Sequence, residues 1–482
     1  MTATATRPAA AGASDRTPLV AGGCVALALL SLAVPATLGY DPWAWLVWGR
    51  EILAGDLDTT GGPSWKPLPI ALTAPLAPLG DLAVPLYTVV ARALALAAVA
   101  AVARLAWRFG GGLAAALAVA LLVLTPDGDP RFLRLVLEGH EAPWSAGLAV
   151  AALVAVLDRR PGRALAWTWS LALLRPEAWP FLLLAAAWAA GVTVPGARRS
   201  ARSWSPRPPA RRSARWAVAA LVSIPLLWFV PDWIGSGSPF HGAGTAQVLA
   251  DRSIASRLVD SLATAAGMVP VVAWVLAGVA VAATWRRGDR GPAVLAAAAA
   301  AWSVLVVAMA AAFGYAAISR FFLPAAAVLV ALAGAGASEA LRAARGWDRG
   351  RVLAAAVGAT VLVALSVPRV VGIGAVADEV ADRGALADDL DEVIEQAGGA
   401  DVLASCDAAV VTARTLLRSA AAWHLGLPLD AVERSVLGQP AVLLLESARA
   451  ARLARADPAA IELAELGRWT VFAHRCPPAA GR

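Results

Sequence analysis

Charged residues are scarce in this chain. Asp, Glu, Lys and Arg together make up 16% of its 482 residues, whereas hydrophobic residues make up 59%. Soluble globular chains carry charge on about a quarter of their residues. The shortage of charge therefore argues against a soluble protein of this length and predicts a polytopic membrane protein.

Lysine and cysteine are almost absent. Lys66 is the only lysine, and the three cysteines are Cys24, Cys406 and Cys476. Cys24 falls within the first apolar run, where we expect an inert core residue. Cys406 and Cys476 fall in the less apolar C-terminal region and could form a disulfide if that region lies outside the cytoplasm. No Cys/His spacing typical of a metal site occurs, so the sequence predicts no metal ligands and leaves a divalent cation open.

The net charge of +7 would by itself suit a nucleic-acid partner. The arginines, however, lie between apolar runs, as they do in the cytoplasmic loops of membrane proteins. The clearest example is the linker at 195–215, which carries seven arginines and no acid. Such a linker is typical of a cytoplasmic loop, with a site for anionic lipid or a partner as the alternative. We therefore expect contact with membrane lipid and no nucleic acid.

The apolar runs predict about 11 transmembrane helices, so the predicted fold class is an all-α polytopic membrane bundle. Arginine clusters fall in alternate loops, which places the N-terminus in the cytoplasm and the C-terminus outside the plasma membrane. The runs lie at 18–38, 83–103, 112–124, 144–157, a short stretch ending at Leu174, 178–194, 216–231, 266–285, 292–313, 321–341 and 352–368.

The sequence predicts three parts. Residues 1–17 form a disordered cytoplasmic tail, 18–371 the transmembrane domain, and 372–482 a small extracytoplasmic α/β domain. Within the last part, DVLASC, PAVLLLES and GRWTVFAHRC are typical of strands, and VVTARTLLRSAAAWHLG is typical of a helix. Two tryptophans there, Trp423 and Trp469, suggest that this domain holds an acceptor glycan.

The stretch from Tyr40 to Lys66 stands out after the first apolar run. It opens with Asp41, continues with tryptophans at 43, 45 and 48, and ends with the only lysine. Tryptophans mixed with sparse charges predict a helix that lies in the membrane interface. An acid at that depth is costly unless it is paired or used. We therefore expect this loop to cover an active site on the non-cytoplasmic face.

The loops predicted to lie outside contain acids, histidines and isolated basic residues next to apolar helix ends. A carboxylate can accept the proton of a hydroxyl group, and Arg or Lys can hold a phosphate that leaves. The charged and titratable residues on this face are Asp41, Glu51, Lys66, Asp127, Asp129, Arg131, Arg134, Glu138, His140, Glu141, Arg175, Glu177, His241 and Arg320.

Several of these candidates also have a purely structural interpretation. Asp41 could cap the interfacial helix, because Asp before Pro-Trp is a good helix start. Arg320 could extend to lipid headgroups without binding a substrate. Arg175 and Glu177 could form a salt bridge that holds a broken helix. The two histidines of these loops could simply form hydrogen bonds within them.

Four segments resemble, in order, motifs of the GT-C superfamily of membrane glycosyltransferases, and more closely its actinobacterial arabinofuranosyltransferase-like and mannosyltransferase-like members. They are LEGHEAPW, LLRPEAWPF, IGSGSPFHGAGTAQ and SRFFLPA, and the acid in GYDPW matches the superfamily's first-loop acid. Order and spacing hold over residues 18–330. The resemblance implies a GT-C-like fold and an inverting transfer of a hexose or pentose from a polyprenyl phosphate to a hydroxyl group of a cell-envelope glycan or lipid.

The same resemblance implies roles for individual residues. Asp41 would be the general base, and Arg320, with Lys66 or Arg175, would bind the donor phosphate. Glu141 would orient hydroxyl groups of the donor or acceptor. Further substrate-binding candidates are Glu138, His140, Glu177 and His241.

Two other classes of protein stay open. A transporter or flippase for a lipid-linked sugar would have charges buried in the middle of its spans and paired half-helices. Here the charges lie at the outer ends of the spans, which favours an enzyme. A non-catalytic envelope assembly protein would tolerate replacement of Asp41.

Overall fold

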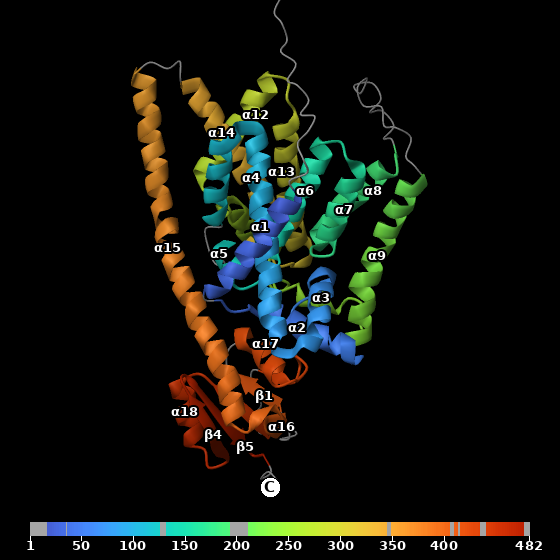
Figure 1. Cartoon of the computed structure of the whole chain (residues 1–482), viewed down its shortest axis with the longest axis vertical. Coiled ribbons are helices and arrows are strands. Elements are labelled where there is room, and N and C mark those ends of the chain that lie inside the picture. The colour runs from blue at the N-terminus through green and yellow to red at the C-terminus, as the bar shows by residue number, and fades with distance from the viewer. Residues whose placement is uncertain are drawn as a thin grey trace, which may run out of the picture.

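The protein is mostly helical, with a small sheet near its C-terminus (Figure 1). The computed structural model describes residues 17–34, 36–125, 132–192, 211–344, 349–404, 409–412, 415–433 and 440–476. The first helices are α1 Thr17–Leu30, α2 Tyr40–Ala54, α3 Pro67–Thr73, α4 Ala83–Val123, α5 Phe132–Leu137, α6 Ala142–Leu157, α7 Pro161–Ala172 and α8 Trp179–Ala189. They are followed by α9 Arg211–Ser236, α10 His241–Thr245, α11 Ile254–Gly267, α12 Val271–Arg286, α13 Gly291–Phe313, α14 Leu323–Ala344, α15 Arg349–Gln396, α16 Gly399–Ala404, α17 Thr415–His424 and α18 Ala448–Arg455.

Several helices are long and apolar enough to cross a membrane, so the chain is a membrane protein. Within the described residues they are Pro67–Val123, Ser213–Ser236, Gly291–Phe313 and Ser319–Ala344. A fifth candidate is the pair α11 and α12, which is bent by 73° at a short break. The total of 11 spans stays a prediction.

Helix α4 contains a break where the sequence predicts the turn between two spans. Gly111 has φ +76° and ψ −161°, a combination that only glycine adopts without strain. The break separates the predicted spans 83–103 and 112–124. The chain therefore reverses at a single glycine instead of a longer loop.

Ion pairs gather the arginine-rich loops at one end of the bundle. Arg108 pairs with Asp158, which joins the break in α4 to the loop between α6 and α7. Arg287 pairs with Glu339 through two bonds of 2.8 Å, which joins the end of α12 to the end of α14. Figure 1 shows the labelled parts of α12 and α14 at the end of the molecule opposite the sheet.

Helix α2 is buried inside the protein instead of lying in the membrane interface. Trp43 is 5% exposed, and Trp45 and Trp48 are fully buried. The interfacial prediction for this helix is wrong, because the C-terminal part of the chain covers it. The indole of Trp48 also donates a hydrogen bond to the carbonyl of Asp58 at 2.8 Å, which folds the following loop back onto the helix.

The C-terminal strands form one five-stranded sheet with the order β2-β1-β3-β5-β4. Strand β1 is parallel to β2 and β3, whereas β5 is antiparallel to β3 and β4. Strands β3 and β5 lie where the sequence predicts strands. The strands are β1 Ala409–Thr412, β2 Val432–Glu433, β3 Ala441–Leu445, β4 Ala460–Leu466 and β5 Trp469–His474.

Three predictions for this region need correction. The segment VVTARTLLRSAAAWHLG does not begin as a helix, because its first three residues belong to β1 and α17 starts at Thr415. The segment DVLASC does not begin with a strand, because α16 at Gly399–Ala404 continues the helical path and β1 starts at Ala409. Trp469 is fully buried and donates its indole hydrogen to the carbonyl of Leu386 at 2.8 Å. It is therefore a core residue and cannot contact a glycan.

Helix α15 joins the bundle to the sheet without interruption. It runs from Arg349 to Gln396 and so passes through residue 371, the predicted end of the transmembrane domain. Its last turns share a hydrophobic core with α2, α17 and the strands. Arg50 of α2 strengthens this contact, since its guanidinium donates to the carbonyls of Trp423 and Leu427 at 3.1 and 2.8 Å.

The structure describes two of the three cysteines. Cys24 is buried and free, and Cys476 is disulfide-bonded. Cys406 lies outside the described residues, so its pairing stays a prediction. The acids and the arginine of the loop at 126–131 lie outside the described residues as well.

Candidate active site

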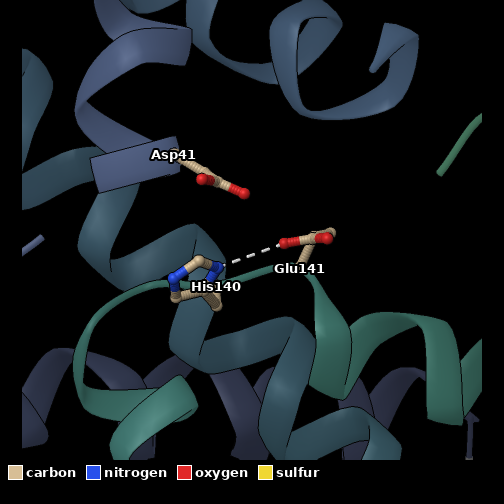
Figure 2. Close-up of side chains that lie close together, drawn as sticks. All are labelled: Asp41, His140 and Glu141. Carbon is tan, nitrogen blue, oxygen red and sulfur yellow. Dashed lines mark hydrogen bonds and ion pairs between the residues drawn. The ribbon is translucent and has the colours of Figure 1, made fainter. Parts of the chain in front are cut away.

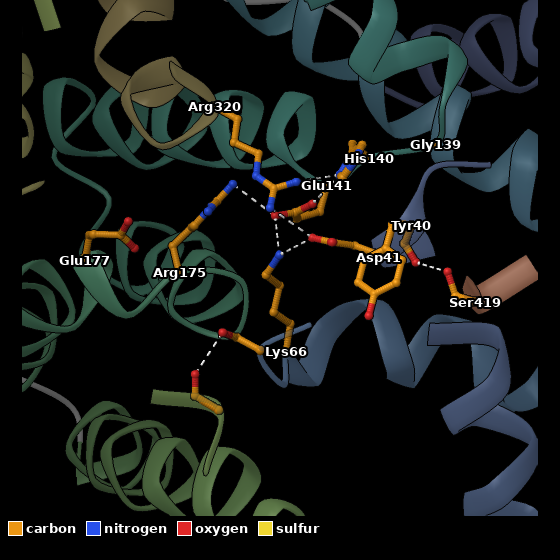
Figure 3. Close-up of polar contacts among 12 residues, drawn as sticks. Tyr40, Asp41, Lys66, Gly139, His140, Glu141, Arg175, Glu177, Arg320 and Ser419 are labelled. Carbon is orange, nitrogen blue, oxygen red and sulfur yellow. Dashed lines mark hydrogen bonds and ion pairs between the residues drawn. The ribbon is translucent and has the colours of Figure 1, made fainter. Parts of the chain in front are cut away.

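Charged side chains from five separate segments meet beside the first turn of α2 (Figure 3). Lys66 Nζ lies 3.2 Å from Asp41 Oδ2 and 2.8 Å from Glu141 Oε1. Arg320 Nη2 lies 3.2 Å from Asp41 Oδ2, and Arg175 Nη2 lies 2.9 Å from Glu141 Oε1. We call these five residues the cation cluster, because three cationic side chains face two carboxylates.

The loop that carries Glu141 depends on a glycine. Gly139 has φ +70°, in the left-handed region, and a Cβ there would lie 3.0 Å from the Leu38 side chain. Its carbonyl accepts a hydrogen bond from the Tyr87 hydroxyl at 2.9 Å. The amide of Gly39 donates to the carbonyl of Glu138 at 2.9 Å, so this loop is bonded to the residues that precede α2. These contacts bring Glu141 next to Asp41.

Two of the cations directly precede a proline. Lys66 and Arg175 both have extended backbones, with φ −143° and −141°. The residue before a proline is sterically excluded from the helical region, which explains this conformation. Each cation therefore lies just before a helical turn. The amide of Leu68 donates to the carbonyl of Leu173 at 3.2 Å and holds the two segments together.

The acids of the cluster are held ionised. Burial would raise the pKa of Asp41, but the positive charges of Arg320 and Lys66 outweigh it and lower the pKa to about 2. Burial opposes ionisation of Glu141 too, and Lys66 and Arg175 hold its pKa well below the usual range. At neutral pH both carboxylates are charged, so the cluster has an excess of one positive charge.

Some hydrogen-bond donors of the cluster have no acceptor among the described residues. The Nε atoms of Arg175 and Arg320 are buried and, within the described part of the chain, have no hydrogen-bond partner. Buried donors are rarely left unpaired, because each costs free energy. Together with the excess positive charge, these donors suit an anionic ligand with several oxygens, such as a phosphate.

Glu177 lies at the edge of the cluster. Its Oε1 accepts a hydrogen bond from the Tyr315 hydroxyl at 3.1 Å, and its Oε2 is buried without a hydrogen-bond partner among the described residues. Burial raises the pKa of Glu177, although the charge of Arg175 opposes this. The structure thus does not show the predicted salt bridge between these two residues, and Arg175 pairs with Glu141 instead.

Sequence reasoning missed two aromatic residues of the site. Tyr315 holds Glu177, and the ring of Phe321 lies 4.4 Å from the guanidinium carbon of Arg175. Their rings stack on each other with centroids 5.1 Å apart. One signal could have found Tyr315: the chain has only three tyrosines, and Tyr87 also supports the site.

Two predicted substrate-binding residues take no part in the ion pairs of the cluster, although the charge of Glu138 acts on Arg320. Glu138 pairs with Arg383 of α15 at 2.5 Å, and Arg383 also pairs with Glu379. This places Glu138 in the joint between α5 and α15. His241 begins the short helix α10, and the structure brings it into none of the ion pairs of the cluster.

A metal ion fits this site poorly. Figure 2 shows Asp41, His140 and Glu141, whose ligand atoms lie within 4.8 Å of one another, as metal ligands can. The ammonium group of Lys66, however, bridges the two carboxylates. His140 Nδ1 is also engaged, at 3.3 Å from both Glu141 Oε2 and Arg320 Nη1. The carboxylates thus already have cationic partners.

An apolar cavity of about 280 Å³ lies among the helices near the cluster. It is lined by residues of α6, α7, α8, α13 and α14, almost all aliphatic or aromatic. Pro324 lines it and lies one helical turn from Arg320, and Leu171 lines it and lies four residues from Arg175. The cavity therefore begins close to two of the cations.

Comparison with solved structures identifies the fold. The chain is similar to ArnT from Cupriavidus metallidurans bound to undecaprenyl phosphate, with a TM-score of 0.50 and 17% identity over 96% of this chain and 98% of that chain. It also matches the archaeal oligosaccharyltransferase AglB from Archaeoglobus fulgidus, in complex with an inhibitory peptide and a dolichol-phosphate, with a TM-score of 0.44 and 12% identity over 86% of this chain and 64% of that chain. No protein-family model and no curated protein matches the sequence. The similarity to ArnT extends over nearly the whole of both chains and shows that the two share a fold.

Proposed function

We propose that this protein is an inverting glycosyltransferase. It moves a sugar from a polyprenyl phosphate to a hydroxyl group of a cell-envelope glycan or lipid. The observation that carries the proposal is the cation cluster, where buried unpaired guanidinium donors and an excess positive charge lie beside an ionised carboxylate. The fold supports it, because the similar protein ArnT is bound to undecaprenyl phosphate.

The donor phosphate would lie against Arg320, Arg175 and Lys66. Arginine suits this role because its fork of donors matches the oxygens of a phosphate. The first isoprene units of the donor chain would occupy the apolar cavity of about 280 Å³, which begins one turn from Arg320, and the rest of the chain would extend into lipid. Both halves of an amphipathic donor would then have matching surroundings.

Asp41 would accept the proton of the acceptor hydroxyl group. The acceptor oxygen attacks the anomeric carbon, the bond from that carbon to the phosphate oxygen breaks, and the polyprenyl phosphate leaves with the bonding electrons. Asp41 with a pKa of about 2 is a weak base while it pairs with Lys66 and Arg320. A bound phosphate would compete for these cations, so the basicity of Asp41 would rise when the donor is in place.

Glu141 would act mainly by holding the cations. It is fully buried, and its Oε1 pairs with both Lys66 and Arg175. His140 and Glu177 would contact the sugar or the acceptor at the edge of the cluster. Glu138, which is close enough to Arg320 to act on it through its charge, and His241 of α10 would contact the sugar or the acceptor from outside the ion pairs of the cluster.

The orientation follows from the arginines. Their loops would lie in the cytoplasm, which puts the N-terminus inside and places the cation cluster and the C-terminal sheet on the outer face of the plasma membrane. On this side a cell-envelope acceptor is available. The four sequence motifs favour an arabinosyl or mannosyl transferase of the actinobacterial type.

The decisive experiment compares the wild type with Asp41→Asn in purified, detergent-solubilised protein. Transfer from undecaprenyl-phosphate-linked arabinose and mannose is measured beside binding of undecaprenyl phosphate. We expect transfer to fall by about 10²–10⁴-fold, because a general base contributes that much, while phosphate binding persists. The matched control Asp260→Asn, at an exposed ion pair, should keep full activity.

Other outcomes would count against the proposal in different ways. Equal transfer by wild type and Asp41→Asn would exclude Asp41 as the base and make Glu141 the next candidate. Phosphate binding without transfer by either protein would instead favour a transporter or an assembly protein.

A further inference from the structure

A second cavity lies on the other side of α2. Its volume is about 320 Å³, which is within the range of small-molecule sites. Residues 36–38, the first turns of α4, α15 and the end of α17 line it together with Trp43 of α2. Trp43 and Asp41 are two positions apart on a helix and therefore point in roughly opposite directions. The cavity and the cation cluster thus flank the same short segment.

The walls of this cavity combine aromatic rings with carboxylates. Trp43 and Trp423 have ring centroids 6.4 Å apart, and the His424 ring lies 5.3 Å from Trp43. Both tryptophans are more than nine-tenths buried. Three aspartates, Asp81, Asp388 and Asp391, lie on its rim, and Asp391 Oδ1 is 2.8 Å from His424 Nδ1.

The sign of the charge in the cavity decides between ligand classes. Among the described residues that line it there is no arginine or lysine. A phosphate or an anionic lipid headgroup would meet three carboxylates, of which only Asp391 pairs with a lining residue, His424, and would be repelled. A neutral sugar suits the walls better, since its hydroxyl groups can donate to carboxylates while its apolar face covers an indole ring.

The cavity opens to the surface on its acidic side, and its inner wall is part of the fold. Gly384 of α15 faces the carbonyl of Ala36 so closely that a Cβ would lie 2.9 Å from that oxygen. Trp423 is held from behind by Arg50, whose guanidinium donates to its carbonyl at 3.1 Å. The aromatic wall is therefore fixed in place before any ligand arrives, which lowers the entropic cost of binding.

We propose that this second cavity binds a neutral sugar unit of the acceptor glycan. The inference rests on the proposed function, because it assigns the acceptor side of that reaction. The sugar in this cavity is not the one that reacts, since the first turn of α2 separates it from Asp41. The cavity would hold a sugar unit of the acceptor that is remote from the reacting hydroxyl group. The binding energy of that remote unit would position the reacting group.

The test measures sugar binding directly on the full chain in detergent. Glucose, mannose, galactose and arabinose are titrated in saturation-transfer NMR, and glucosamine serves as a cationic probe with the same ring as glucose. We expect at least one neutral sugar to bind, and glucosamine to bind several-fold more tightly than glucose because of the three carboxylates. Asp388→Asn should weaken sugar binding roughly tenfold and reduce the preference for glucosamine.

Matched variants separate the cavity from the rest of the protein. Trp423→Phe keeps an aromatic ring and should weaken binding, whereas Trp107→Phe, at a tryptophan 62% exposed elsewhere, should not. Asp260→Asn, at an exposed ion pair away from both sites, should leave sugar binding unchanged. The proposal is overturned if none of the sugars binds, or if Asp388→Asn and Trp423→Phe bind them as the wild type does.

The same measurements keep this proposal apart from the proposed function. Sugar binding that depends on Trp423, in a protein that transfers nothing and does not bind undecaprenyl phosphate, would retain the cavity and reject the transferase. Sugar transfer by a protein whose cavity binds no sugar would do the reverse.

Discussion

The two sides of α2 differ in the sign of the charge that surrounds them. On one side Asp41 contacts Lys66 and Arg320. On the other side Trp43 faces three aspartates and no arginine or lysine among the described lining residues. Both sides are rich in aromatic residues, so aromatic content does not distinguish them. The difference teaches that the charge of the lining favours a phosphate on one side and disfavours a phosphate on the other.

The largest change in the free energy of unfolding should come from breaking a buried ion pair of the cluster. Arg175→Met leaves Glu141 buried with one cation fewer, which we expect to lower the free energy of unfolding by about 3–5 kcal/mol. Arg252→Met breaks a pair of the same 2.9 Å length with Asp260, but both side chains are more than half exposed. That control should cost about 1 kcal/mol or less. Denaturant unfolding in detergent measures both, and equal losses would contradict the buried network.

The second prediction contrasts two acids of α2. Burial raises the pKa of Glu51 to about 7, whereas the cations hold that of Asp41 near 2. Folded Glu51 therefore binds protons more tightly than the unfolded chain, with its ordinary pKa of 4.5, does. Its contribution to stability is present below pH 4.5 and is lost as the pH rises to about 7, in total about 3 kcal/mol.

Glu51→Gln should remove this pH dependence. We expect the variant to lose less stability than the wild type between pH 5 and pH 8, as measured by thermal unfolding. Asp41→Asn serves as the comparison, because Asp41 stays ionised over the whole of this range. A wild-type profile that is flat between pH 5 and pH 8 would show that Glu51 is already ionised in the folded protein.

A third prediction concerns the ligand that each side recognises. Undecaprenyl phosphate at about 100 times its dissociation constant should stabilise the wild type by about 2.7 kcal/mol. Arg320→Met should lose most of this stabilisation, because it removes a guanidinium whose Nε is a spare donor. Asp388→Asn, on the other side of α2, should keep all of it. Equal effects of the two variants would mean that the two sides do not differ in what they bind.

The smallest change in the free energy of unfolding should come from a substitution in the acid-lined cavity on the Trp43 side of α2. Asp388 lies on an exposed part of α15, so Asp388→Asn should change the free energy of unfolding by no more than about 0.5 kcal/mol. A larger loss would show that this residue supports the fold, and its use as a probe of sugar binding would then fail. Thermal unfolding without ligand checks this directly.

The sequence predicts which residues belong to the cation cluster better than it predicts which of them form ion pairs with each other. All five residues of the cluster lie at predicted helix ends on one face, and the structure brings them together: Asp41, Lys66, Glu141, Arg175 and Arg320. Loop order shows which residues share a face, but not which side chains meet. The pairing of Arg175 with Glu141 instead of Glu177 depends on how the helices pack.

Contacts between distant segments account for the remaining errors. Glu138 meets Arg383 across 245 positions, because α15 passes beside the loop that carries Glu138. The tryptophans of α2 have the pattern of an interfacial helix, yet α17 and the strands cover them. Apolar residues at an interface and in a core look alike in a sequence. Only the packing of the C-terminal part distinguishes the two cases.

The position of the single lysine has a practical consequence. Lys66 carries the only ε-amino group of the chain, and it is 6% exposed between two carboxylates. A reagent selective for side-chain amines would therefore modify one atom in the whole protein, at the centre of the cluster. The rate of that reaction would report when the ammonium group leaves its carboxylates, so the protein contains its own chemical reporter for events at this site.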